Sequence, residues 1–355
     1  MKKYLFFLLF AAKVTAQQQN LEEVARFGRY QPVGLAISRE GRTFVTFPHW
    51  TSDYQYGLIE LRPDGTQKPY PDETWNRSGE SRSGESRSGD PQTRFVGLQA
   101  LYIDAANTLW ALDTGAGGVK LLKINLKTNT VERVYHFEDI PKSEIGLNDV
   151  NVDAARKVAF FSDPRRAAIV VLNLETGKSR TVLRGSTFTT ADPGYILKID
   201  GKEVREPSGK PFSSNVNGIA LTKDYLYFRP ITQTRLFRVP VDKLINGTEP
   251  EITSAVEVVG QTGISHGMLA DADGNIYMGD SEKKTLCRWV ATTGRQEVLA
   301  QDERILWPDS FAIGPDGYLY VTAAQLQRAP RYNGGEDRTE YPFRLYRVKL
   351  PSNQK

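Results

Sequence analysis

Six equivalent positions in the chain carry mostly polar residues, each directly before an apolar, strand-like stretch. In chain order these positions hold Val33, Gln99, Asn148, Asn217, His266 and Asp309. Amide and carboxylate oxygens are ligands for hard cations such as Ca²⁺, and a histidine shifts the preference toward Mn²⁺ or Zn²⁺. The same groups can instead hydrogen-bond a small molecule, or satisfy one another around a wet channel. The residue types therefore leave three interpretations open: a metal site, a ligand site and a structural network.

We expect the polar members of this set to meet a small molecule. The predicted ligand-binding residues are Gln99, Asn148, Asn217, His266 and Asp309. The predicted ligands of a divalent metal, if one is bound, are Asn148, Asn217, His266 and Asp309. Asp149 adds a carboxylate beside this set, so Asp149 or Asp309 is the predicted catalytic general base if the protein is an enzyme. The sequence has no H-E-x-x-H pair or glycine-rich phosphate loop, and we expect no nucleophile elbow.

Six copies of one sequence pattern must position these residues. Each copy runs from an apolar stretch through a polar turn into a second stretch rich in aromatic and β-branched residues; the copies begin at Gly34, Ala100, Asp149, Gly218, Gly267 and Ser310. Turn pairs such as Asp273-Gly274 are typical of tight β-hairpins. A repeat spacing of about 40 to 70 residues is typical of a propeller. We therefore predict an all-β, six-bladed β-propeller of four-stranded antiparallel blades, a single domain over residues 17–355 with the six positions around its axis.

Three segments depart from the repeated pattern. Residues 78–90 read SGESRSGESRSGD, a low-complexity run of small and charged residues that predicts a flexible loop. Residues 185–214 form an insertion between the third and fourth blades, either a lid over one face or a hairpin extension. The tail after Ala323 ends in YPFRLYRVKL and must return the chain beside the N-terminal strand to close the ring.

The N-terminus has the three parts of a signal peptide over residues 1–16. Two lysines precede a short apolar run, and Val14-Thr15-Ala16 is a small-residue cleavage site. We expect an exported protein, periplasmic or extracellular, without a membrane anchor. The formal net charge of +4 includes three lysines of this segment, and we expect no nucleic-acid partner because no basic patch interleaved with aromatic residues is present. The single cysteine, Cys287, excludes an internal disulfide.

Four segments of the chain carry a family resemblance. They read LQALYIDAANTLWALDTG, VNGIALTKDYLYFRPITQTRLFRVPVDKL, SHGMLADADGNIYMGDSE and LWPDSFAIGPDGYLYVTAAQLQ. These segments resemble the yellow/major royal jelly protein family, in particular its bacterial-type members described as L-dopachrome tautomerase-related. The resemblance covers nearly the whole mature chain and implies a secreted six-bladed propeller. The activity it implies is not uniform, because some members bind small amines in the central cavity and others are linked to dopachrome isomerisation.

A more distant resemblance is to the six-bladed gluconolactonase/senescence-marker proteins. Asn148 in LNDV and Asn217 in NGI match two positions of that family's axial site. Val33 stands where the family has a metal-binding Glu, and His266 stands where it has the Asp of a D-G-M motif. Two anionic ligands are therefore replaced, and a neutral imidazole does not substitute for a carboxylate toward Ca²⁺.

Three functional hypotheses follow from the sequence. The first is a secreted protein that binds a small polar or aromatic molecule in its axial cavity. The second is an enzyme, either a metal-assisted lactonase of the gluconolactonase kind or a dopachrome-type isomerase. The third is a scaffold that binds another protein through its rim loops. The first accounts best for a polar ring without a recognised catalytic motif.

Overall fold

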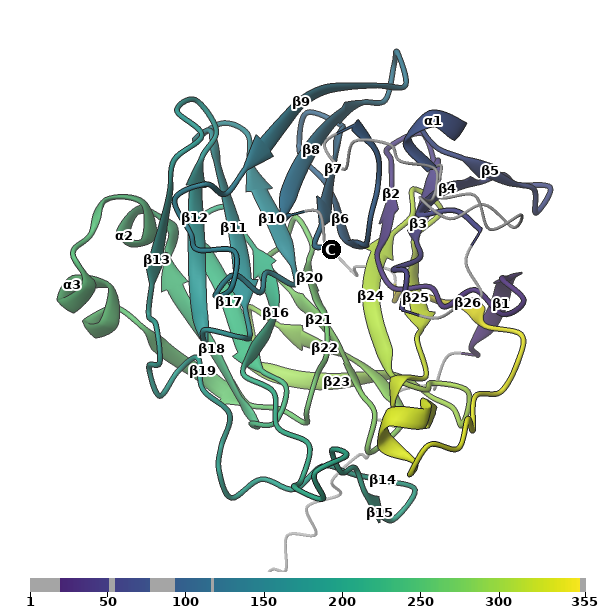
Figure 1. The fold of residues 1–355 in the computed structure, drawn as a ribbon. Helices are drawn as coiled ribbons and strands as arrows, with labels where there is room; N and C mark the ends of the chain where they lie inside the picture. Colours follow the sequence, from purple (N-terminus) through teal and green to yellow (C-terminus); the bar gives the residue numbers. More distant parts are fainter. Residues whose placement is uncertain (1–19, 51–54, 77–92, 116–117, 352–355) are drawn as a thin grey trace, which may run out of the picture.

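Six four-stranded antiparallel sheets surround one axis in the computed structural model (Figure 1). The structure describes residues 20–50, 55–76, 93–115 and 118–351. The predicted signal peptide 1–16 and the low-complexity loop 78–90 lie outside the described residues. The sheets confirm the predicted all-β, six-bladed propeller with four-stranded blades.

Each blade runs from an inner strand beside the axis to an outer strand at the rim. The inner strands are β2 (Leu35–Ile37), β6 (Leu98–Ile103), β10 (Val150–Asp153), β16 (Val216–Leu221), β20 (Met268–Ala270) and β24 (Pro308–Ile313). The second strands are β3 (Thr43–Thr46), β7 (Thr108–Asp113), β11 (Val158–Asp163), β17 (Tyr225–Pro230), β21 (Ile276–Asp280) and β25 (Tyr318–Ala323). The third strands are β4 (Leu58–Leu61), β8 (Lys120–Asn125), β12 (Ala168–Asn173), β18 (Arg235–Pro240), β22 (Thr285–Val290) and β26 (Arg344–Lys349). The outer strands are β5 (Gln67–Pro69), β9 (Thr130–His136), β13 (Ser179–Val182), β19 (Glu257–Gln261), β23 (Arg295–Gln301) and β1 (Glu22–Arg26).

The last blade is completed by the first strand of the chain. β1 pairs antiparallel with β26, so the sheet order in this blade is β1-β26-β25-β24. Two ion pairs join the two strands: Arg347 Nε lies 2.9 Å from Glu22 Oε2, and Arg344 Nε lies 3.0 Å from Glu23 Oε2. The predicted return of the tail to the N-terminal strand is confirmed, and this pairing closes the ring with residues more than 300 positions apart.

The turns between the first two strands of a blade use the chemistry that their sequences predict. Gly274 and Gly317 have φ of +82° and +74°, a conformation that glycine adopts without a Cβ clash. The aspartate before such a turn also accepts backbone hydrogen bonds. Asp271 Oδ1 accepts from the N–H groups of Asp273 and Asn275, both at 2.9 Å. These turns set the register of each inner strand and therefore the level of each ring residue on the axis.

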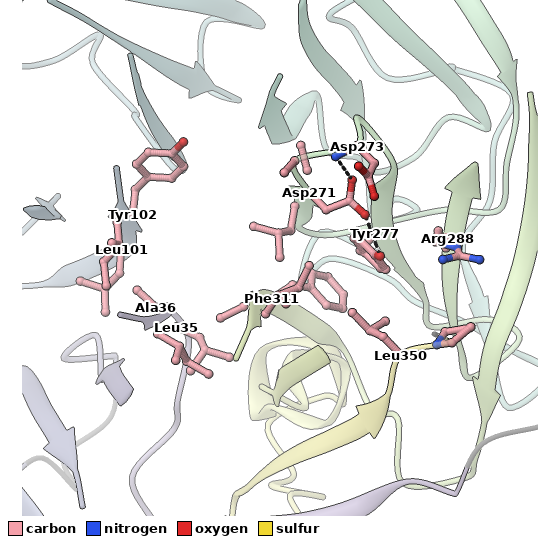
Figure 2. Close-up of a pocket in the computed structure, with 18 residues that line it drawn as sticks. Leu35, Ala36, Leu101, Tyr102, Asp271, Asp273, Tyr277, Arg288, Phe311 and Leu350 are labelled. Carbon is pink, nitrogen blue, oxygen red and sulfur yellow. Dashed lines mark hydrogen bonds between the residues drawn. The ribbon is translucent and has the colours of Figure 1, made fainter. Parts of the chain in front are cut away.

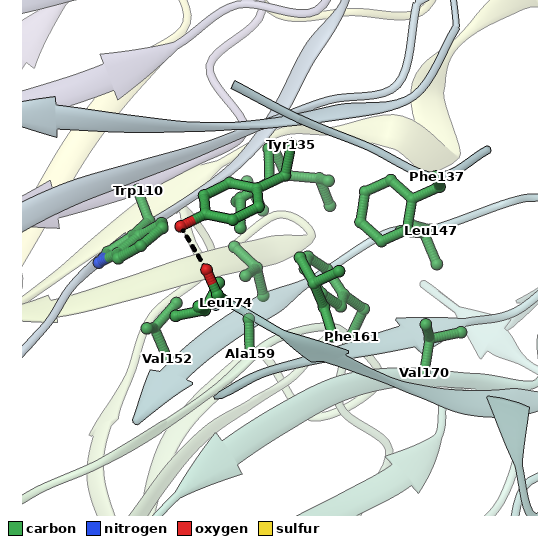
Figure 3. Packing of buried hydrophobic residues seen from close by; sticks show 14 of the residues in the cluster. Trp110, Tyr135, Phe137, Leu147, Val152, Ala159, Phe161, Val170 and Leu174 are labelled. Atoms are coloured by element: carbon green, nitrogen blue, oxygen red, sulfur yellow. Dashed lines mark hydrogen bonds between the residues drawn. The ribbon is translucent and has the colours of Figure 1, made fainter. Parts of the chain in front are cut away.

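The hydrophobic core is divided among the interfaces between neighbouring blades rather than gathered at one centre. The interface of the second and third blades is one example, with several aromatic side chains (Figure 3). There Phe137 packs edge-on against Phe161 with ring centroids 5.2 Å apart, and the Tyr135 hydroxyl donates to the Leu174 carbonyl at 3.2 Å. Burying one such side chain contributes roughly 1.5–3 kcal/mol. This packing holds the blades at fixed angles, so the inner strands reach the axis as a rigid set.

The remaining regular elements are short and lie outside the blades. They are α1 (Glu73–Asn76), α2 (Val241–Asn246), α3 (Glu249–Ser254), the hairpin strands β14 (Lys198–Ile199) and β15 (Lys202–Glu203), and the 3-10 helices η2 (Leu326–Arg328) and η3 (Pro330–Tyr332). Helix α3 begins with a capping box, in which Thr248 and Glu251 each bond the other's backbone N–H. In the part of the chain that the structure describes, no helix has the length and apolar character needed to cross a membrane.

Candidate functional site

Three amide side chains of the predicted ring form a hydrogen-bonded chain across three blades. Gln99 Nε2 donates to Asn148 Oδ1 at 3.2 Å, and Asn148 Nδ2 donates to Asn217 Oδ1 at 3.0 Å. Asn148 and Asn217 are half-buried, and Gln99 is buried. The structure thus brings these residues together at the starts of β6, β10 and β16, as the repeats predict. Their mutual hydrogen bonds fit the structural-network interpretation, and their ligand-binding role stays a prediction.

The ring lies at a level of the propeller where neighbouring inner strands touch through glycines. A Cβ on Gly267 would come within 1.8 Å of the Asp309 carbonyl oxygen, and one on Gly218 within 3.0 Å of the His266 carbonyl oxygen. A Cβ on Gly34 would meet the Gln99 carbonyl oxygen at 2.8 Å. Only glycine permits this approach of one backbone to the next. Neighbouring inner strands therefore approach one another closely at the level of the ring.

The two carboxylates of the predicted catalytic set are both held in poorly solvated surroundings. Asp149 Oδ1 accepts from Val150 N–H at 2.9 Å, and Asp149 Oδ2 accepts from Ile219 N–H at 3.4 Å. Burial raises the pKa of Asp149 to about 7, although these two N–H groups act in the opposite direction. Burial also raises the pKa of Asp309 to about 7, and the charge of Asp149 adds to it. Each carboxyl can therefore gain or lose a proton near neutral pH, which is the property a general acid or base needs.

His266 does not join the amide chain, although it occupies the equivalent ring position. The side chain is 1% exposed, its Nε2 lies 2.6 Å from Ser281 Oγ, and its ring stacks on Trp307 with centroids 3.8 Å apart. Its Nδ1 has no hydrogen-bond partner among the described residues. Burial, together with the positive charge of Arg229, lowers the pKa of His266 to about 3. The imidazole is therefore neutral and packed as part of the wall.

One segment matches the spacing of a G-x-S-x-G nucleophile motif but does not have the structure of a nucleophile elbow. Residues 263–267 read GISHG, which has the spacing G-x-S-x-G. A nucleophile elbow requires a sharp strand-to-helix turn that exposes the serine. Here the strand β20 follows, and Ser265 is fully buried with its Oγ donating to the Gly267 carbonyl at 2.7 Å. This match to the motif was overlooked at the level of the sequence, and the buried Ser265 does not have the exposed position that a nucleophile elbow gives its serine.

The donor set of the ring does not suit a hard divalent metal. Val33 offers no ligand, and the amide oxygens of Asn148 and Asn217 already accept hydrogen bonds from neighbouring side chains. His266 Nε2 already lies 2.6 Å from Ser281 Oγ, so Asp309 is the one anionic group in the predicted metal-ligand set. Among the described residues, no three His, Cys, Asp or Glu side chains are grouped as metal ligands. The predicted metal site stays a prediction, and no chemical step below depends on it.

The insertion 185–214 covers the starts of two inner strands. It carries the hairpin β14–β15, and its apolar side chains pack in one cluster with Ile264 and Trp307, directly before β20 and β24. Phe212 of the insertion meets Trp307 edge-on at 5.6 Å. The insertion is tied to the body by Tyr195, whose hydroxyl donates to Glu282 Oε2 at 2.5 Å. The insertion is therefore a hairpin extension, and it packs over the segments that lead into β20 and β24.

A cavity opens at the other end of the inner strands. It has a volume of about 500 Å³ and is lined by the last residues of β2, β6, β20 and β24 (Figure 2). A second cavity of about 790 Å³ adjoins it and shares Tyr102 and Asp271 as lining residues. At about 3.3 Å per residue, Leu101 in the wall lies roughly 7 Å along β6 from Gln99 in the ring. None of the predicted site residues lines either cavity, so the sequence reasoning missed this site.

The cavity has apolar walls, and the charged side chains at its rim already make hydrogen bonds or an ion pair. Figure 2 shows Tyr102 and Leu101 on one side of the hollow, with Asp271 on the other side. Asp271 accepts four hydrogen bonds, including one from the Tyr277 hydroxyl at 2.9 Å. Arg288 pairs with Glu297 at 2.8 Å. Apolar walls with few available polar groups and a volume of this size are typical of small-molecule sites.

The fold and this cavity define a class, the β-propellers with a ligand-sized hollow on the axis. The sequence is more specific, because a family model described as "Major royal jelly protein" matches residues 96–354, and the chain belongs to this family. The family resemblance read from the sequence is thereby confirmed. No curated protein sequence matches the chain significantly.

Solved structures of very different sequence share the fold. Virginiamycin B lyase from Staphylococcus aureus is similar with a TM-score of 0.53 at 13% identity, covering 94% of this chain and 100% of that one. The calcium-binding protein regucalcin from Agrobacterium tumefaciens has a TM-score of 0.52 at 15% identity, covering 94% of each chain. A gluconolactonase from Xanthomonas campestris has a TM-score of 0.52 at 13% identity, covering 93% of this chain and 89% of that one. At these identities the likeness establishes the fold alone.

Proposed function

We propose that the protein binds a small molecule in its axial cavity and that the molecule enters where the inner strands end. The observation that carries this proposal is the cavity of about 500 Å³, lined by four inner strands. The opposite end has a ring of bonded amides and is partly covered by the insertion 185–214. Ligand binding in a central cavity is also what the family resemblance implies for some members. We therefore place the ligand in the cavity at the ends of the inner strands, and not at the ring of polar side chains at their starts.

A cavity-filling variant tests the proposed site. Ala270 is half-buried at the end of β20 and lines both cavities, so Ala270→Phe places a ring in the space that a ligand would occupy. The matched control is Ala291→Phe, an exposed position in the same blade that lines neither cavity. We expect thermal-shift and calorimetric screening to find small molecules that bind the wild type and the control but not Ala270→Phe. Ligands that bind all three proteins equally would place binding elsewhere.

A second candidate function is proton transfer of the isomerase kind at Asp149 and Asp309. It is favoured by one observation, the raised pKa of about 7 in each carboxyl group. One carboxylate would remove a proton and a carboxylic acid would return one, without a metal. The test is isomerisation of L-dopachrome by wild type and Asp309→Asn. Equal rates in both proteins, or no rate above the buffer blank, would remove this candidate.

We also propose that the mature protein is exported after cleavage of residues 1–16. The support is the order of charged, apolar and small residues in this segment. The chain expressed with its own N-terminus should appear outside the cytoplasm with Gln17 as its first residue, as read by mass spectrometry of the N-terminal peptide. Retention in the cytoplasm with residues 1–16 intact would contradict this.

A further inference from the structure

We infer that Tyr102 is the residue that recognises the ligand, and that the ligand is an uncharged, largely apolar molecule carrying a hydrogen-bond acceptor such as a ketone carbonyl. This inference rests on the proposed function, because it assigns the chemistry of the same cavity. The inference adds that Tyr102 recognises the ligand and that the ligand is uncharged.

Tyr102 stands out among the residues at its level of the propeller. Three residues after each ring position the inner strands carry Ala36, Tyr102, Asn151, Ala220, Leu269 and Ala312. Three of the six are alanines, and Tyr102 is the single aromatic residue. Two of these alanines, Ala36 and Ala312, line the cavity, and the Tyr102 ring lies on one side of it (Figure 2). A planar ligand can pack against this ring in an offset-stacked or edge-on arrangement.

Tyr102 is the one polar side chain of this cavity lining that makes no hydrogen bond with the described residues. The side chain is only half-buried. The other polar side chains of the lining are engaged: Tyr277 bonds Asp271, Arg288 bonds Glu297, and Asp273 also has a partner. The Nε of Arg288 has no partner but is fully buried, so a ligand in the cavity does not reach it.

The charges around Tyr102 select a neutral partner. Burial raises the pKa of Tyr102 to about 12, and the negative charges of Asp104 and Asp153 add to the effect. The phenol therefore stays protonated and can donate, while the same field repels an anionic acceptor such as a carboxylate. Asp104 already accepts three N–H donors and Asp153 pairs with Arg156 at 2.7 Å, so neither carboxylate beside Tyr102 is free to pair with a cation. Asp271 in the lining accepts only from uncharged donors, so the amine probe below tests whether its charge attracts a cation. A neutral carbonyl oxygen is the acceptor that this environment accommodates.

A second feature sets the size and shape of the ligand. The walls are the apolar side chains of Leu35, Leu101, Leu269 and Phe311, with Ile103 and Ile313 toward the mouth. A volume of about 500 Å³ is within the usual range for sites of drug-sized molecules. A bicyclic aromatic ketone satisfies the walls and the single hydroxyl together, whereas a sugar would leave most of its hydroxyl groups unpaired.

The experiment measures the binding of four matched probes by calorimetry or fluorescence. The probes are 2-acetylnaphthalene, 2-ethylnaphthalene, 2-naphthoate and (naphthalen-2-yl)methylamine. The proteins are wild type, Tyr102→Phe, Ala270→Phe and the control Ala291→Phe. We expect the ketone to bind the wild type at least tenfold more tightly than the carboxylate or the amine. Tyr102→Phe should weaken ketone binding about three- to tenfold, the usual net effect of one neutral hydrogen bond, and leave the ethyl probe unchanged.

The outcomes separate this inference from the proposed function. If the probes bind the wild type and are lost in Ala270→Phe, but Tyr102→Phe has no effect on the ketone, the cavity is the site and Tyr102 is not its recognition group. Tighter binding of the amine or the carboxylate than of the ketone overturns the assignment of a neutral ligand. If no probe binds, or if Ala270→Phe binds all of them like the control, both the proposed function and this inference fail. Equal melting temperatures of wild type and Tyr102→Phe show that the variant is folded.

Discussion

Trp307 lies flat against His266, with the two ring centroids 3.8 Å apart and the planes inclined by 20°. Trp307 has φ of +55°, a conformation that a bulky residue adopts only where its surroundings impose it. Phe212 of the insertion meets the same indole edge-on, and the Trp307 side chain also hydrogen-bonds Asp309. Trp307 therefore connects the insertion to two residues of the ring.

The first prediction concerns the stability of the protein in acid. The pKa of His266 is about 3 in the folded protein against an ordinary value of 6.5. Below pH 6.5 the unfolded chain takes up a proton that the folded protein does not, so His266 lowers the stability progressively as the pH falls from 6.5 toward 3. At pH 4 the loss is about 3 kcal/mol. His266→Gln should abolish this part of the acid sensitivity, as measured by denaturant unfolding at pH 7 and pH 4.

The control for that measurement is His136→Gln, because His136 is exposed on the outer strand β9. It should follow the wild type at both pH values. If His266→Gln loses as much free energy of unfolding between pH 7 and pH 4 as the wild type does, His266 is not buried as a neutral imidazole.

The second prediction concerns Asp309, whose effect on stability becomes unfavourable as the pH rises rather than as it falls. The pKa of Asp309 is about 7 in the folded protein against an ordinary value of 3.8. The unfolded chain ionises first as the pH rises, so Asp309 lowers stability between about pH 4 and pH 7. Asp309→Asn should then be more stable than the wild type at pH 8, by up to about 4 kcal/mol, and similar to it near pH 4. Unfolding in denaturant at the two pH values measures the difference.

An exposed aspartate provides the contrast for this second test. Asp64 accepts the Thr66 N–H at 2.9 Å, and this bond lowers the pKa of Asp64. Asp64→Asn should therefore bring no gain in stability at pH 8. A wild type that is more stable than Asp309→Asn at pH 8 would show that the Asp309 carboxylate is stabilised rather than strained at the axis.

Much of the fold was predictable because its signals are local. An Asp-Gly pair between two strand-like stretches specifies a hairpin wherever it occurs, and Gly274 shows this with its φ of +82°. Two of the six inner hairpins have an Asp-Gly turn, and the repeated pattern of strand, polar turn and strand locates the other four. Even the closure by β1 and β26 followed from the need of the last blade for a fourth strand. The positions of Gln99 and Asn148 in the ring were predictable for the same reason, since equivalent repeat positions lie at the same height.

The candidate site was less predictable because it depends on contacts between distant segments. The direction of the His266 side chain follows from Trp307, 41 residues later, and from the buried Arg229 of another blade. The location of the open end depends on where the insertion packs, which no local pattern specifies. Tyr102 could have been noticed in an alignment of the repeats, because three of the five equivalent positions hold alanine and none holds another aromatic residue. That difference becomes meaningful only once the cavity is seen.

A third prediction concerns metal content. The amides of Asn148 and Asn217 are already hydrogen-bonded, and Asp309 is the single carboxylate of the predicted metal-ligand set, which is a poor donor set for Ca²⁺, Mn²⁺ or Zn²⁺. We expect elemental mass spectrometry of the purified protein to find less than one tenth of a metal per chain. Chelator and added metal should each leave the melting temperature unchanged. A stoichiometric metal whose removal lowers the melting temperature would support a lactonase-like site, with His266 reoriented as a ligand.

The last prediction tests the insertion as a cover. Phe212 is 6% exposed and packs against both Trp307 and Tyr332, so Phe212→Ala removes the main anchor of the hairpin β14–β15. Truncating a buried phenylalanine costs about 3–5 kcal/mol. Because the blades have their own cores, this loss should fall on the insertion. Hydrogen exchange of residues 195–212 should become faster, while the strands of the blades stay protected.

The matched control for the cover is Ile196→Ala, in the same insertion, because that side chain is 40% exposed. It should leave exchange in the insertion close to the wild type. If the cover also keeps His266 neutral, Phe212→Ala should raise the pKa of the imidazole toward its ordinary value, as followed by NMR titration of the ring protons. Release of the insertion with no change in that pKa would mean that Trp307 and Arg229 alone keep His266 in its neutral form, and that the insertion has no influence on the axis.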